Sequence, residues 1–122
     1  TATQLVVNLT TPPTTTGSLT AVVTSFGGTS GNPVQVATIL NAANTPVFGA
    51  PTSTADGFTV QISNYDALFT YAGTATVGSV SISGAGLVTV TGVAAFTSST
   101  ATITTTRTNY VSASQCCACR SC

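Results

Sequence analysis

Charged residues are almost absent from this sequence. Its 122 residues include no lysine, glutamate or histidine, and charged residues make up 3% of the chain, against about a quarter in ordinary domains. Without these side chains the usual general bases are missing, and neither a Ser-His-Asp nor a Cys-His arrangement can be built. We therefore expect no enzymatic activity. The charged residues are Asp56, Asp66, Arg107 and Arg120.

The scarcity of positive charge also excludes whole classes of partner. Nucleic-acid binding draws most of its affinity from Lys and Arg on phosphates, and attraction to anionic membranes uses the same residues. No apolar run approaches the roughly 18 to 20 residues of a membrane span, so we expect no membrane insertion. A surface without charge associates readily, because solubility normally depends on surface charge. The composition therefore favours a protein whose final state is an assembly, or one that is coated with sugar.

Cysteine is missing until the last seven residues, CCACRSC, which hold all four. Four thiolates at this spacing can be interpreted as a zinc site, as local intrachain disulfides or a reduced tail, or as disulfides between chains. A redox CxxC lacks its usual βαβ setting. We favour disulfides between chains and hence an extracellular location, since the preceding domain offers no cysteine as a partner. The predicted cross-linking residues are Cys116, Cys117, Cys119 and Cys122.

What the chain has in abundance is threonine, 27 residues, in segments where apolar residues alternate with polar ones. In GFTVQIS, for example, Phe58, Val60 and Ile62 share one face. This period of two is typical of strands with one buried face, and turn signals separate the segments. We predict an all-β, antiparallel sandwich or jelly roll of about eight or nine short strands over residues 17–112, followed by a Cys-rich tail at 113–122. Residues 40–44 are also compatible with a short helix of one or two turns.

The N-terminal residues 1–16 combine a strand pattern with the stiff linker TPPTTTG. Such a strand either folds back as the first strand of its own sheet or reaches out and pairs with the exposed edge of a neighbour. In the second case the inserting face, and the contact between subunits, consists of Leu5, Val7 and Leu9.

The remaining polar and aromatic residues have simpler interpretations. Asp56 and Asp66 lie in turn signals and are expected to form turns, with a weak Ca²⁺ site as the alternative. We predict no metal and no cofactor. Four aromatic residues are expected mainly to pack, although they also suit stacking on sugars. They are Tyr65, Phe69, Tyr71 and Tyr110.

Two stretches, GSLTAVVTSFGGTSG at 17–31 and GFTVQISNYDALFTYAGTATVGSVSIS at 57–83, resemble the strands of bacterial endospore appendage subunits. The resemblance implies a jelly-roll sandwich that stacks into extracellular fibres by sheet augmentation, with disulfides from terminal connectors. That family carries its connector cysteines near the N-terminus, where this chain has none, so no cysteine position carries over. The leading strand and its linker also resemble donor-strand pilins.

Together these observations predict a structural subunit of an extracellular filament or surface appendage, whose partner is another copy of the chain. Strand or sheet augmentation and disulfides would join the copies. The alternative is a carbohydrate-binding or adhesive sandwich at a cell or spore surface, with surface glycans as its ligands. A third interpretation, a zinc-binding tail, predicts metal in the purified protein.

Overall fold

The computed structural model describes residues 6, 8–11 and 15–120, and it divides the chain into two compact units, Thr1–Asn41 and Ala42–Cys122. The described part of the chain is all-β and contains no helix, so the short helix expected at residues 40–44 is not formed. Strand β5 (Asn41–Ala42) occupies that position instead. The sequence placed residues 17–112 in one sandwich, whereas the observed boundary falls between residues 41 and 42.

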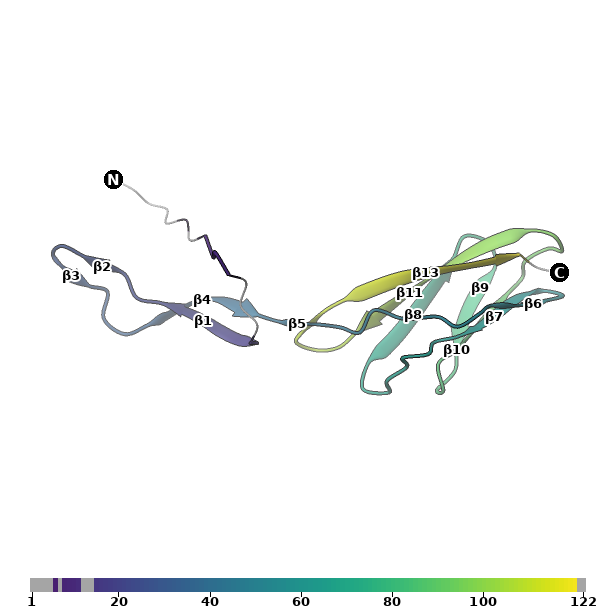
Figure 1. Cartoon of the computed structure of the whole chain (residues 1–122), viewed down its shortest axis with the longest axis horizontal. Helices are drawn as coiled ribbons and strands as arrows, with labels where there is room; N and C mark the ends of the chain where they lie inside the picture. Colours follow the sequence, from purple (N-terminus) through teal and green to yellow (C-terminus); the bar gives the residue numbers. More distant parts are fainter. Residues whose placement is uncertain (1–5, 7, 12–14, 121–122) are drawn as a thin grey trace. The chain divides into compact units, whose positions relative to one another are not determined.

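The second unit is an antiparallel sandwich of two sheets (Figure 1). One sheet has the strand order β6-β7-β10-β9, and the other has the order β13-β11-β8. These strands are β6 (Thr52–Thr54), β7 (Gly57–Gln61), β8 (Thr70–Ala75), β9 (Ser79–Ile82), β10 (Leu87–Thr91), β11 (Ser98–Thr106) and β13 (Ala113–Arg120). A two-residue strand, β12 (Tyr110–Val111), lies between β11 and β13 in the sequence.

The two strand orders match those of a constant-type immunoglobulin sandwich. If the seven strands of the two sheets, without β12, are lettered A to G along the chain, one sheet is A-B-E-D and the other is G-F-C. This is the arrangement of that sandwich. The all-β sandwich predicted from the sequence is therefore confirmed. The jelly roll, a double Greek key of eight strands, is not confirmed.

The core lies between the two sheets and follows from the alternation in the sequence. Phe58 and Val60 of β7 face inward, as predicted, and are 0% and 2% exposed. Strand β11 alternates without a break, with Ala101 and Ile103 buried. Threonine and valine at neighbouring positions suit a pleated surface with one buried face, so the pattern specifies both the strands and their inner face. The buried apolar cluster is Phe58, Val60, Ile62, Val88, Val90, Val93, Ala101, Ile103 and Cys117.

The first unit is a two-stranded antiparallel ribbon rather than part of this sandwich. Strand β1 (Gly17–Ala21) pairs with β4 (Val34–Ile39), and β2 (Thr24–Ser25) pairs with β3 (Gly28–Thr29). None of the described residues of this unit is buried. The ribbon therefore has no core of its own.

Candidate functional site: an amphipathic ribbon and a cysteine-rich edge strand

The ribbon presents one polar face and one apolar face, as its register shows. Leu19 lies opposite Ala37, and a register shift follows, so that Thr20 lies opposite Gln35. The Gln35 side-chain amide donates to the Thr38 hydroxyl over 3.0 Å, which places these two side chains together on the polar face. Since side chains alternate between faces, Ser18 and Thr20, which lie opposite Thr38 and Gln35, share this polar face, and the pairs that alternate with them form the opposite face. The polar face is Ser18, Thr20, Gln35 and Thr38, and the apolar face is Leu19, Ala21, Val34, Ala37 and Ile39.

Within the described residues of the first unit, no second layer lies over the apolar face. Val34 is 62% exposed, and Val36, at the register shift, is 59% exposed. An isolated two-stranded ribbon is marginally stable in water, and a third strand or a covering layer is needed for independent stability. The ribbon therefore lacks, within its own unit, the covering layer that a stable sheet needs.

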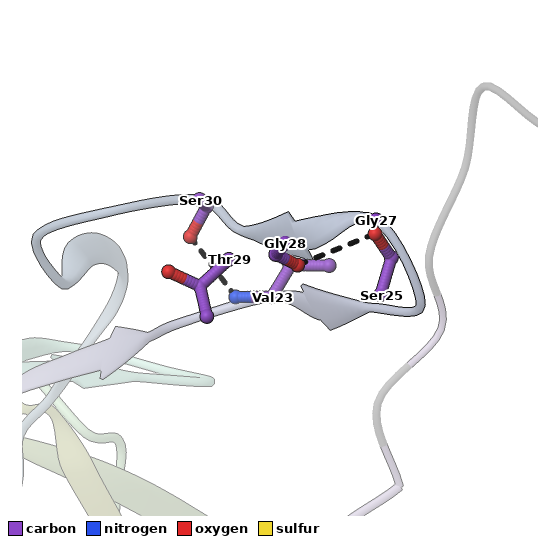
Figure 2. A pocket seen from close by; sticks show the side chains of 6 residues that line it. All are labelled: Val23, Ser25, Gly27, Gly28, Thr29 and Ser30. Atoms are coloured by element: carbon purple, nitrogen blue, oxygen red, sulfur yellow. Dashed lines mark hydrogen bonds between the residues drawn. The ribbon is translucent and has the colours of Figure 1, made fainter.

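The ribbon tip is apolar as well. The turn between β2 and β3 places Phe26 fully in solvent, at 112% of its reference exposure, and Val22 and Val23 beside it are about half exposed. An open hollow of about 340 Å³ lies at this tip. Figure 2 shows the valine, serine, threonine and glycine residues that line it. Two hydrogen bonds shape it, from the Val23 N–H to the Ser30 hydroxyl and from the Ser25 hydroxyl to the Gly28 carbonyl.

In the second unit, the residues assigned to a Cys-rich tail form a strand up to Arg120. Strand β13 pairs antiparallel with β11 over its full length, from Ala113 opposite Thr105 to Arg120 opposite Ser98. It is the outermost strand of its sheet, and within the described residues it pairs with β11 alone. Three of the four cysteines are therefore held at defined positions on a sheet edge.

Strand alternation sends the three described cysteines to opposite faces. Cys116 is exposed on the outer face, where its Sγ lies 3.7 Å from the Thr102 Oγ1. Cys117 points into the core and is 9% exposed. The Cys119 side chain, half-buried on the same inner face, has its Sγ 3.3 Å from the Ser53 Oγ. Among these three thiols, Cys116 alone faces outward. The described cysteines, all predicted as cross-linking residues, therefore differ in their exposure to a second chain.

Burial also changes the chemistry of Cys117. Loss of solvent raises the pKa of this thiol above its ordinary value of 9.0, and the neighbouring Cys116 raises it further. Since the thiolate is the nucleophile, a thiol that stays protonated inside the core is unreactive at neutral pH.

This difference predicts selective alkylation of the reduced, folded protein. At pH 8, iodoacetamide is expected to modify Cys116 and to leave Cys117 unmodified, whereas in guanidinium chloride both thiols react. Mass spectrometry of the tryptic peptide that ends at Arg120 would locate each label. Equal labelling of both thiols in the folded protein would contradict the placement of Cys117 in the core.

The other predicted contact residues lie at or beyond the described residues. Leu5, Val7 and Cys122 fall outside them. Leu9 is described; it lies in no strand of the structure, and its side chain is 52% exposed. The exchanged N-terminal strand therefore stays a prediction.

The four aromatic residues form two separate clusters. Tyr65 and Tyr71 stack with ring centroids 4.9 Å apart and pack against the core. Phe69 and Tyr110 meet edge to face at 5.4 Å, and the Arg107 guanidinium lies over both rings, at 5.3 and 5.0 Å from their centroids. These rings contact one another and the arginine, which is the packing role expected of them.

The two aspartates have different environments. Asp66 accepts the Leu68 N–H on its side chain at 2.9 Å and the Phe69 N–H on its carbonyl at 3.0 Å, which confirms its role in a turn. The Asp56 carbonyl accepts the Val93 N–H at 3.0 Å.

Over residues 6, 8–11 and 15–120, no three Cys, Asp, Glu or His side chains gather as metal ligands. In the same part of the chain, no helix is long and apolar enough to cross a membrane.

Comparison of the chain with protein-family models, with curated proteins and with solved structures gave no match.

Proposed function

We propose that this chain is a structural subunit that assembles with copies of itself into an extracellular filament or surface layer. The observation that carries the proposal is the apolar face of the ribbon. It has the alternation of a half-buried sheet, yet no covering layer lies over it among the described residues of the first unit. Covering this face with another copy would supply the layer that a two-stranded ribbon needs for stability.

The near absence of charge supports the same proposal. Natural edge strands avoid pairing with other chains by carrying charged residues, prolines or bulges. Strand β13 has no charged residue before Arg120 and no proline, and β8 at the opposite edge of the same sheet has neither. Strand β8 therefore lacks two of the common devices that oppose sheet augmentation between subunits, and β13 lacks both up to its last residue, Arg120.

Two further elements are proposed to join the subunits. The N-terminal strand, with Leu5, Val7 and Leu9 as its apolar face, would add to a sheet edge of a neighbour. Cysteines of the C-terminal segment would then link neighbours covalently, so that a subunit, once added, could not dissociate. Because disulfides persist in oxidising surroundings, an extracellular or surface location goes with this role.

Electron microscopy of the purified full chain tests the proposal. The full chain, concentrated under air, is expected to form fibres or layers, and a non-reducing gel is expected to show ladders that collapse with reductant. A variant lacking residues 1–10 is expected to lose the polymer while the sandwich keeps its circular dichroism spectrum. Unchanged polymer in this variant would refute the exchanged strand alone. A full chain that stays monomeric at high concentration under air would refute the proposed function.

A further inference from the structure

We infer that β13 pairs antiparallel with β13 of a second copy about a two-fold axis at Cys116, and that the two Cys116 thiols form a disulfide across that axis. The inference rests on the proposed self-assembly, and it names which edge and which cysteine join two copies.

The edges of the two sheets favour β13 over its competitors. Strands β6 and β9, which border the other sheet, have three and four residues, and β8 has six. Strand β13 has eight residues and pairs with β11 along its whole length, which keeps it extended and straight. A long, ordered edge without charge before its last residue, Arg120, is the best template for an added strand.

The side chains of β13 allow a second copy to approach closely. On its outer face lie Ser114, Cys116 and Ala118, all small and all exposed. In a two-fold antiparallel pair centred on Cys116, each Ser114 lies opposite Ala118 of the other copy. At the outer-face positions nearest the axis no bulky or charged pair therefore meets, and the two three-stranded sheets join into one continuous sheet; farther out, Gln115 lies opposite Cys117 and Arg120 opposite Ser112.

The geometry of such a pair matches that of a disulfide. Directly opposed residues in an antiparallel pair have Cα atoms about 4.5–5.5 Å apart, which falls within the roughly 4.4–6.8 Å found for disulfides. At the axis, Cys116 is opposed by Cys116 of the second copy on the same face of the sheet. Cys117 faces the core and is excluded from this bond by its burial.

Formation of the bond requires an oxidant, and the one proposed is a low-molecular-weight disulfide. The thiolate of one Cys116 attacks a sulfur of the oxidant, RS–SR, and releases one thiol, RSH. The second Cys116 thiolate then attacks this mixed disulfide and releases the other RSH. Two cysteine thiols are oxidised to one S–S bond, the oxidant is reduced to two thiols, and the protons of the cysteines end on the released thiols.

Cysteine variants of the full chain test the covalent link. Oxidised glutathione is added to the reduced protein, and the dimer is read on a non-reducing gel and by peptide mapping. Cys116→Ser is expected to lose the reductant-sensitive dimer, whereas Cys117→Ala, the control, is expected to keep it. A dimer that persists in Cys116→Ser, or that maps to other cysteines, would overturn the inference.

A charge-swap pair tests the strand pairing itself. Ser114→Lys with Ala118→Lys places lysine opposite lysine at both positions, and Ser114→Glu with Ala118→Glu does the same with glutamate. Each variant alone is expected to lose the Cys116 disulfide dimer, and a mixture of the two is expected to restore it as a heterodimer of distinct mass. Dimer formation by each variant alone at the wild-type level, or no heterodimer in the mixture, would overturn the inference.

The outcomes separate this inference from the proposed function. Fibres or layers without a Cys116 disulfide would refute the β13 pairing and leave the proposed function in place. A wild-type chain that remains monomeric under air would refute both. Unchanged thermal unfolding of each variant, followed by circular dichroism, confirms that the sandwich is folded in every comparison.

Discussion

A single aspartate on the apolar face of the ribbon, introduced by Leu19→Asp, is expected to abolish the non-covalent self-association that covers this face, measured under reducing conditions, and to leave the sandwich folded. In the isolated subunit position 19 is half-buried, so the carboxylate keeps part of its hydration and costs less than in an assembly. In an assembly that covers this face, the carboxylate would be buried without a partner, at a cost of at least about 3 kcal/mol. That cost weakens association by more than about a hundredfold.

The polar face of the same ribbon supplies a matched control. Ser18 is the neighbour of Leu19 in β1 and points to the opposite face, so Ser18→Asp adds the same charge to the same strand. This variant is expected to assemble like the wild type. Analytical ultracentrifugation over a range of concentrations would measure both variants. Equal weakening by the two substitutions would show that charge alone, and not the apolar face, opposes assembly.

The sandwich itself is expected to lose much of its stability when Gly86 is replaced by alanine. Gly86 has φ = +81°, in the left-handed region, and an added Cβ would lie 2.6 Å from the Tyr65 Cγ. The ring of Tyr65 is stacked on Tyr71 and packed against the core, so it cannot move away freely. Backbone strain and this steric overlap together are expected to cost about 2–4 kcal/mol.

Gly84 lies in the same turn and serves as the control. A Cβ at Gly84 would meet no atom within 4 Å, and this residue lies outside the left-handed region. Gly84→Ala is therefore expected to leave the melting temperature nearly unchanged, while Gly86→Ala lowers it by roughly 10–20 °C. Thermal unfolding followed by circular dichroism gives both values. Similar melting temperatures for the two variants would contradict the contact between Gly86 and Tyr65.

The strands of the sandwich could be predicted because their alternation is a local signal. Phe58, Val60 and Ile62 share one face in the sequence and are all buried in the core. The same signal could not show what covers a face, which is a property of distant residues. The ribbon strands alternate like the strands of the sandwich, so the sequence pattern assigned them to the sandwich. Within the described residues of the first unit, however, no layer covers their apolar face.

The cysteine strand was missed for a related reason. CCAC contains no β-branched or aromatic residue, and its spacing is typical of ligands or cross-links rather than of a strand. The strand forms because β11 provides a partner from Ser98 to Thr105, a long-range pairing that local propensity does not report. The inward and outward alternation of Cys116 and Cys117 follows from that pairing. Once β13 was assigned as a strand, the different exposure of the two thiols could have been predicted.

The position of Cys117 between the sheets bears on the order of two steps, the folding of the chain and the proposed oxidation of Cys116. In a newly made, unfolded chain the adjacent thiols compete for any oxidant on equal terms, and mispaired products would accumulate. After the sandwich closes, one of the two thiols is sequestered and its neighbour remains available. Under the proposed Cys116 disulfide, folding would therefore come before oxidation, and an environment that reverses the two steps would yield covalently scrambled chains.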